Sequence, residues 1–243
     1  MSKIFEALQL RELETPSDTP WTAQTLTVTP RPSAPKKFEE RILGLYRRIE
    51  AMLDGDGARI VSLVSMTSVK ESFTYTFELA RLAAKQFRLR VLVLCTHGSG
   101  ASQHLLNGAP LQRGWEQAAF EDKPLAETVH KIEEPPIHIS QLNASIVSLP
   151  TLVASPKFEP FITRMRKQYD IILIDSRPFT DGMDAALLSP VADGTILIVD
   201  AGSSRWQVVR NAVDQVVSQR GTLLGVVLNK RKHYIPNFIY RRL

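Results

Sequence analysis

The sequence has little cysteine and no long apolar run, and each shortage excludes a class of protein. Its one cysteine, Cys95, cannot form an internal disulfide, which excludes the disulfide-rich secreted domains. No apolar stretch approaches the roughly 18 residues of a membrane-spanning helix. The first residues carry charges such as Lys3, Glu6 and Arg11, where a signal peptide has an apolar centre. We therefore expect a soluble, cytoplasmic protein.

The sequence also lacks a metal-ligand motif, and it lacks acidic residues near its end. The five histidines do not recur at a metal-ligand spacing and the net charge of +5 is mild, so we predict neither a metal site nor a nucleic-acid partner. No acid follows Asp214, which leaves a basic and aromatic end. This end is either a solvated surface or a contact with an anionic membrane. The residues that would make such a contact are Lys230, Arg231, Lys232, Arg241 and Arg242.

Composition divides the sequence into four parts. Residues 1–14 place apolar side chains at the spacing of a short amphipathic helix, which we expect to be a docking element. Residues 15–36 are rich in proline and threonine and bury too little surface to offset their ordering entropy, so we expect a flexible linker. Residues 37–230 have the length and hydrophobic pattern of one α/β domain. Residues 231–243 form the basic, aromatic tail.

Apolar stretches alternate with amphipathic ones through most of residues 37–230. The continuously apolar stretches are typical of strands buried on both faces of a parallel sheet. The expected strands are 59–66, 90–95, 171–175, 195–200 and 223–228, with one more near 146–149. The expected helices are 38–53, 72–87, 157–168, 183–191 and 206–219. The pattern predicts an α/β fold with a mostly parallel sheet and helices on both faces.

The segment 65–74 follows the first strand of the domain, at the place where a phosphate-binding loop would lie. Such a loop needs glycines, because its amides converge on phosphates through conformations that side chains disfavour, and a lysine for the outer phosphates. The segment has no glycine, and its candidate ligands are Lys70 and Ser72. The alternatives are an ordinary strand-to-helix turn with Ser72 as N-cap residue, which the missing glycines favour, and a nucleotide site.

The second half of the chain carries the motifs of a known family. They are the segments 169–178, 192–199 and 225–230, together with the pair Asp184-Ala185. These segments resemble the Walker B to carboxy-terminal portion of the bacterial tyrosine kinases, P-loop proteins that regulate capsule and exopolysaccharide export. Residues 1–8 and 235–243 resemble the two ends of some members. The resemblance implies a P-loop NTPase-like fold of the MinD/ParA type.

The chain also departs from the active members of this family. Their first loop carries a glycine-flanked lysine directly before a serine or threonine, whereas here Glu71 stands before Ser72 and Lys70 falls early. After the second strand the family places an Asp-x-Asp pair that handles magnesium. The matching positions here are Cys95 and His97, which are poor substitutes for hard oxygen ligands of Mg²⁺.

One acidic position of the family pattern is retained, because Asp175 matches the Walker B aspartate. The resemblance therefore implies that Lys70, Ser72 and Asp175 are vestigial cofactor-binding residues, with no catalytic residue and no bound metal. ATP and Mg²⁺ would be cofactors only if the kinase were active. Phosphoryl transfer needs several preorganised groups, and each lost group costs roughly 10²-fold or more in rate.

We interpret the chain as a non-catalytic relative of these kinases, a cytoplasmic scaffold or regulatory subunit in exopolysaccharide synthesis and export. The resemblance implies a location at the inner membrane and a polysaccharide co-polymerase or synthase subunit as partner, with an active paralogue as a further one. Two alternatives remain open. One is an active ATP-dependent tyrosine autokinase with an atypical loop, and the other is a relative of the MinD/ParA positioning ATPases.

Overall fold

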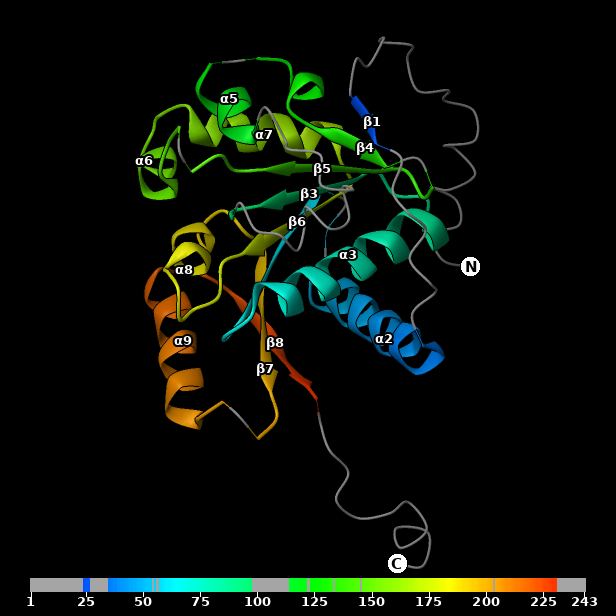
Figure 1. Cartoon of the computed structure of the whole chain (residues 1–243), viewed down its shortest axis with the longest axis vertical. Helices are drawn as coiled ribbons and strands as arrows, with labels where there is room; N and C mark the ends of the chain where they lie inside the picture. The colour runs from blue at the N-terminus through cyan, green and yellow to red at the C-terminus, as the bar shows by residue number, and fades with distance from the viewer. Residues whose placement is uncertain are drawn as a thin grey trace, which may run out of the picture.

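The computed structural model describes most of the α/β domain (Figure 1). The described residues are 24–26, 35–53, 55, 57–97, 114–121, 123–132, 134–144, 146–202 and 204–230. The expected docking helix 1–14 and the basic tail 231–243 lie outside these residues. Within the expected linker, Gln24–Leu26 forms the short strand β1, which pairs with another strand of the sheet.

An eight-stranded sheet forms the centre of the structure, in the order β1-β4-β5-β3-β6-β2-β7-β8. The strands after β1 are β2 (Arg59–Ser65), β3 (Val91–Cys95), β4 (His130–Ile132), β5 (Ile137–Gln141), β6 (Ile171–Ser176), β7 (Gly194–Asp200) and β8 (Leu223–Asn229). From β5 to β8 in this order all neighbours are parallel, whereas β4 is antiparallel to β5. The predicted α/β class with a mostly parallel sheet is confirmed.

Helices cover both faces of this sheet, as predicted (Figure 1). They are α2 (Lys36–Met52), α3 (Val69–Gln86), α5 (Trp115–Phe120), α6 (Leu149–Val153), α7 (Phe158–Gln168), α8 (Asp184–Leu188) and α9 (Trp206–Ser218), with a 3₁₀ turn at Leu125–Glu127. α2 and α3 pack on one face, and α5 to α9 pack on the other. No helix in the described part of the chain has the length and apolar character of a membrane span.

Strand β2 shows why the central strands read as continuous apolar runs. Alternate side chains of a strand point to opposite faces of its sheet. Val61 and Leu63 therefore join the core beneath α2 and α3, while Ile60 and Val64 join the cores on the opposite face. All four side chains are fully buried, so both faces of the strand demand apolar residues.

The region between α5 and α7 differs from the expectation. The predicted strand near residues 146–149 is wrong, because the chain there turns into helix α6. Ser148 accepts a hydrogen bond from the backbone N–H of Thr151, and Pro150 occupies the first turn, both of which favour the start of a helix. The strands in this region are instead β4 and β5, whose mixture of polar and apolar residues gave no continuous apolar run.

Candidate functional site

The candidate site lies where several parallel strands end at one edge of the sheet. β2, β3, β6, β7 and β8 run in the same direction, so the loops that follow them are neighbours. Asp175 of β6 pairs in register with Leu63 of β2 and with Cys95 of β3, which places it in the middle of this edge. Ligands of open parallel sheets bind at the carboxyl ends of the strands.

The turn from β2 to α3 consists of residues 66–68 only, and the chain's own groups hold it. Ser65 is fully buried, and its Oγ accepts hydrogen bonds from the backbone N–H groups of Ser68 (2.7 Å) and Thr67 (3.2 Å). The carbonyl of Ser65 accepts from the backbone N–H of Phe179, in the segment that follows β6. Amides that a phosphate-binding loop would present to a ligand are thereby bound within the protein.

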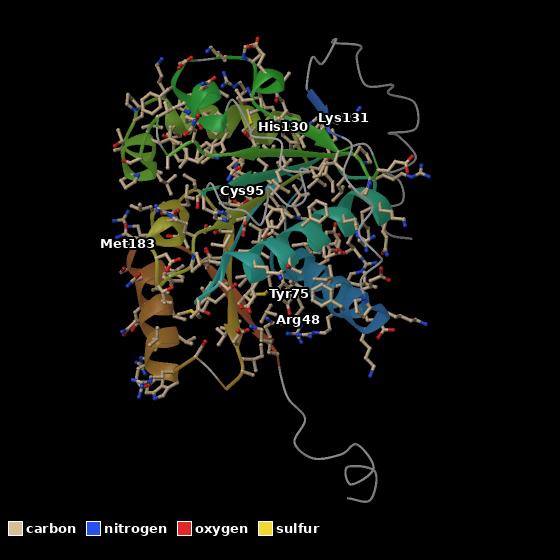
Figure 2. All side chains as sticks on the ribbon, in the orientation of Figure 1. Arg48, Tyr75, Cys95, His130, Lys131 and Met183 are labelled. Atoms are coloured by element: carbon tan, nitrogen blue, oxygen red, sulfur yellow. The ribbon has the colours of Figure 1, made fainter. Side chains whose placement is uncertain are left out.

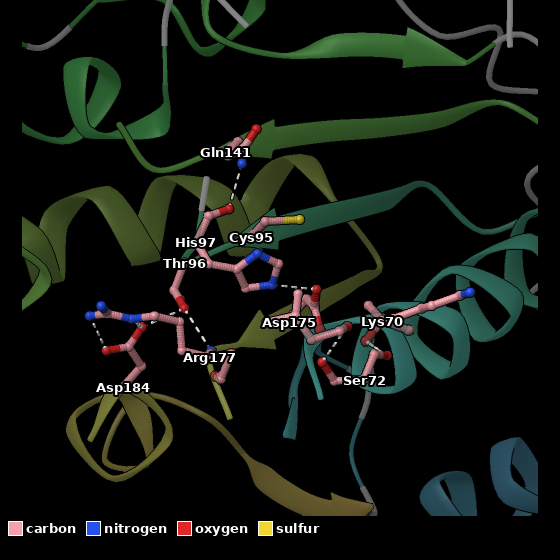
Figure 3. Close-up of polar contacts among 12 residues, drawn as sticks. Lys70, Ser72, Cys95, Thr96, His97, Gln141, Asp175, Arg177 and Asp184 are labelled. Atoms are coloured by element: carbon pink, nitrogen blue, oxygen red, sulfur yellow. Dashed lines mark hydrogen bonds and ion pairs between the residues drawn. The ribbon is translucent and has the colours of Figure 1, made fainter. Parts of the chain in front are cut away.

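The short turn changes the positions of the predicted site residues. α3 begins at Val69, with Ser68 in the N-cap position, so the expectation that Ser72 caps the helix is wrong. Ser72 lies in the first turn, where its buried hydroxyl donates to the carbonyl of Val69 (3.1 Å). Lys70 is exposed, and its amino group points away from Asp175 (Figure 3). The structure therefore brings Ser72 and Asp175 together and leaves Lys70 apart.

Asp175 is fully buried and paired with His97, as Figure 3 shows. The distance from His97 Nε2 to Asp175 Oδ2 is 2.8 Å, and only 5% of His97 is exposed. Burial raises the pKa of Asp175 above its usual value, and the hydrogen bond from His97 opposes this rise. Asp175 Oδ1 accepts no hydrogen bond among the described residues, since the nearby Ser72 hydroxyl donates to its own helix.

Thr96 and Gln141 connect the His97–Asp175 pair to neighbouring strands of the sheet. Thr96 donates its backbone N–H to the carbonyl of Asp175 (3.0 Å), and Gln141 of β5 donates its side-chain amide to the carbonyl of His97 (2.5 Å). Burial, and secondarily the charge of Asp175, raise the pKa of the Cys95 thiol well above its usual value. Cys95 is therefore neutral, and a neutral thiol is a poor metal ligand.

A second buried carboxylate, Asp184 at the start of α8, is held by an arginine and a hydroxyl. Arg177 forms two hydrogen bonds with it, from Nε to Oδ2 (2.9 Å) and from Nη2 to Oδ1 (2.9 Å). The hydroxyl of Thr96 donates to the same Oδ2 (2.6 Å) and accepts from the backbone N–H of Arg177. Figure 3 shows this cluster beside the His97 ring. It joins the ends of β3 and β6 to α8.

An ion cluster closes the other side of the edge, between α3 and β8. Lys230, which follows β8, donates to Asp200 at the end of β7 (2.7 Å) and to Glu71 in the first turn of α3. These two hydrogen bonds raise the pKa of Lys230. Asn229 donates to Asp200 (3.0 Å) and accepts from Tyr75 of α3, which Figure 2 labels. Lys230 is thus paired with two carboxylates of the protein, although its side chain is 61% exposed.

The residues at this edge do not fit a magnesium-bound nucleotide. Thr67 and Ser68 donate their amides to Ser65, and the residue before Ser72 is the acid Glu71. An acid beside the start of α3 would repel phosphates, where a P-loop places a lysine. The described residues contain no group of three His, Cys, Asp or Glu side chains arranged to hold a metal ion.

Sequence reasoning found Ser72, Asp175 and the unusual His97, but it missed the groups that bind them together. Neither Ser65 nor the contact between Glu71 and Lys230 was predicted. The acid Glu71, at the position directly before Ser72 where the family has a lysine, was the available signal that this loop has different contacts. The partner of Glu71 is Lys230, which is 159 residues away in the sequence.

Comparison with known proteins identifies relatives by sequence. No protein-family model matches the chain. It is 34% identical over 89 residues to the tyrosine-protein kinase CpsD of Streptococcus pneumoniae serotype 4, covering 36% of this chain and 39% of the relative. Another CpsD of Streptococcus pneumoniae is 23% identical over 195 residues, covering 80% of this chain and 85% of the relative. The succinoglycan biosynthesis transport protein ExoP of Rhizobium meliloti is 30% identical over 79 residues, which are 32% of this chain and 10% of ExoP.

Solved structures show the same fold at lower identity. The chimerical protein CapA2B2 has a TM-score of 0.70 at 18% identity, covering 86% of this chain and 93% of that one. The kinase domain of the Escherichia coli tyrosine kinase ETK has a TM-score of 0.69 at 16% identity, with coverages of 82% and 78%. The MinD protein of Aquifex aeolicus has a TM-score of 0.57 at 14% identity, with coverages of 76% and 73%. In sequence this chain is similar to bacterial tyrosine-protein kinases and to a polysaccharide transport protein, and its fold is P-loop NTPase-like.

Proposed function

We propose that this chain is a non-catalytic, pseudokinase member of its family that acts through protein contact in exopolysaccharide synthesis and export. The observation that carries the proposal is the turn of residues 66–68, in which the amides of Thr67 and Ser68 are bound to Ser65. The acid Glu71 beside this turn and the pairing of Asp175 with His97 support it. In the described residues, these contacts occupy two amides that would otherwise face a triphosphate and one oxygen of the carboxylate that would otherwise face magnesium.

The proposed partner is an inner-membrane polysaccharide co-polymerase or synthase subunit, with an active paralogue as a further partner. The likeness to ExoP, a succinoglycan biosynthesis transport protein, supports a place in polysaccharide transport. In this proposal the protein is cytoplasmic and peripheral to the inner membrane. Residues 1–14, joined to the domain by residues 15–36, would serve as the docking element, because a tethered motif reaches its partner at high effective concentration.

Nucleotide binding tests the non-catalytic assignment. In isothermal titration calorimetry with a nonhydrolysable ATP analogue and MgCl₂, we expect no binding tighter than about millimolar, since the amides of Thr67 and Ser68 are bound to Ser65 and Lys70 points away from Asp175. Incubation with γ-labelled ATP should leave the protein's tyrosines unlabelled.

The contrary results separate the alternatives. Label on the protein's own tyrosines, with micromolar binding lost in Lys70→Ala, would establish an active autokinase. Lys85→Ala, at the exposed end of the same helix, is the matched control and should leave any binding unchanged. Micromolar binding and hydrolysis without tyrosine labelling would instead point to a MinD/ParA-type ATPase.

We further propose that the tail contacts an anionic membrane through Arg231, Lys232, Arg241 and Arg242. Each basic residue near an anionic surface contributes about 1 kcal/mol. Replacing all four by glutamine should therefore lower co-sedimentation with phosphatidylglycerol vesicles at least about tenfold. Lys230→Gln is the control and should bind as the wild type does, since Lys230 is engaged by Glu71 and Asp200. Equal sedimentation of the fourfold variant and the wild type would remove the tail from the proposal.

A further inference from the structure

The His97 imidazole contacts one oxygen of the Asp175 carboxylate, and in the described part of the chain the other oxygen has no hydrogen-bond partner. Asp175 Oδ2 accepts from the imidazole at 2.8 Å, and Oδ1 accepts no hydrogen bond among the described residues. The carboxylate is fully buried and the imidazole nearly so. A buried carboxylate is strongly unfavourable without a compensating charge or hydrogen bond.

Hydrogen bonds hold the backbone at His97. The carbonyl of His97 accepts from the side chain of Gln141. The preceding residue, Thr96, donates its backbone N–H to Asp175 and its hydroxyl to Asp184. β3 and β6 are paired in register up to Cys95 and Asp175, so His97 emerges directly beside the end of β6. The ring therefore reaches Asp175 without any rearrangement of the sheet.

Lysine and arginine side chains nearby are engaged elsewhere or directed away from Asp175. Lys70 points away from the carboxylate, as Figure 3 shows. Arg177 is bound to Asp184 by two hydrogen bonds, and Lys230 is bound to Asp200 and Glu71. Within the described residues, His97 is the partner that the structure provides for the Asp175 carboxylate.

We propose that the His97 imidazole is a permanent internal substitute for the divalent cation at Asp175, so that this carboxylate is closed to metal. This inference rests on the proposed non-catalytic function and extends it, because it names the group that closes the site. The imidazole occupies Oδ2, and Oδ1, the oxygen left for a cation, is buried from solvent, whereas Mg²⁺ usually keeps several of its waters when a protein binds it. Cys95, the other residue at the family's metal-handling positions, is a neutral buried thiol.

Replacing the imidazole by a carboxylate should reverse the closure. In His97→Asp, two carboxylates meet at a buried position and repel each other, so in EDTA the thermal midpoint should fall by about 5 °C or more. Millimolar MgCl₂ should restore much of this loss, because the two carboxylates now supply oxygen ligands. The midpoint of the wild type should be the same in EDTA and in MgCl₂.

His97→Gln is the matched control, since it removes the imidazole without adding a carboxylate. Its midpoint should not respond to MgCl₂. A magnesium response in the wild type equal to that of His97→Asp, or a folded His97→Asp with no response, would overturn the inference.

If His97→Asp fails to fold, His97→Ala gives a second measurement. Added imidazole should raise the thermal midpoint of His97→Ala and leave that of the wild type unchanged. The absence of that recovery would equally overturn the inference.

The experiment separates this inference from the proposed function. Nucleotide binding by the wild type would contradict the non-catalytic proposal itself, whatever His97→Asp does. If the wild type binds no nucleotide and the midpoint of a folded His97→Asp variant does not respond to MgCl₂, only the inference about His97 is contradicted, and the non-catalytic proposal stands.

Discussion

Replacing Trp115 by alanine is expected to lower the free energy of unfolding by about 3–5 kcal/mol, the range for truncating a large buried aromatic residue. Trp115 is 2% exposed and stacks on Phe161 with ring centroids 5.9 Å apart. Its indole N–H donates to the carbonyl of Cys95 (3.0 Å), two residues before His97. Chemical denaturation followed by circular dichroism measures the change without depending on tryptophan fluorescence.

Two further variants show whether burial or the hydrogen bond of Trp115 is responsible. Trp115→Phe keeps most of the stacking and loses the N–H, so it should cost about 1–2 kcal/mol. Trp206→Ala is the matched control, because Trp206 also begins a helix but is 62% exposed, and it should cost less than about 1 kcal/mol. Equal losses for Trp115→Ala and Trp206→Ala would contradict the packing described here.

The substitution Asp184→Ala should cost about 3 kcal/mol of unfolding free energy. Asp184 is buried and accepts from Arg177 twice and from Thr96 once, so its removal leaves a buried hydroxyl and an arginine without their acceptor. The half-exposed Arg177 can turn to water, which keeps the loss below that of a fully buried pair. Urea denaturation measures the change.

The neighbouring Asp181 gives the control for this prediction. Asp181 is exposed and accepts a hydrogen bond from the adjacent Thr180, so Asp181→Ala should change the free energy of unfolding by less than about 0.5 kcal/mol. Thr96→Val removes one donor to Asp184 at nearly constant volume and should cost about 1 kcal/mol. A loss in Asp184→Ala no larger than that in Asp181→Ala would show that the cluster does not hold β3, β6 and α8 together.

The sequence by itself determined the class of the fold, and it predicted which edge of the sheet carries the candidate site. Strands buried on both faces require apolar residues at every position, so β2, β6 and β7 were visible as continuous runs. The same reasoning failed for β4 and β5, whose strands are short and carry polar residues such as His130, Lys131 and Gln141. Local capping by Ser148 and Pro150 likewise prevailed over the apolar run at residues 146–149.

The candidate site could be predicted only as a set of residues, and the tertiary structure decided what each one does. The sequence showed that glycines were lacking around Lys70 and that Cys95 and His97 stood at acidic positions of the family pattern. It did not show that His97 reaches Asp175, or that Lys230 reaches Glu71, because those pairs are 78 and 159 residues apart. Apolar periodicity is a local property of the chain, whereas the pairing of buried charges depends on which strand ends the folded sheet places side by side.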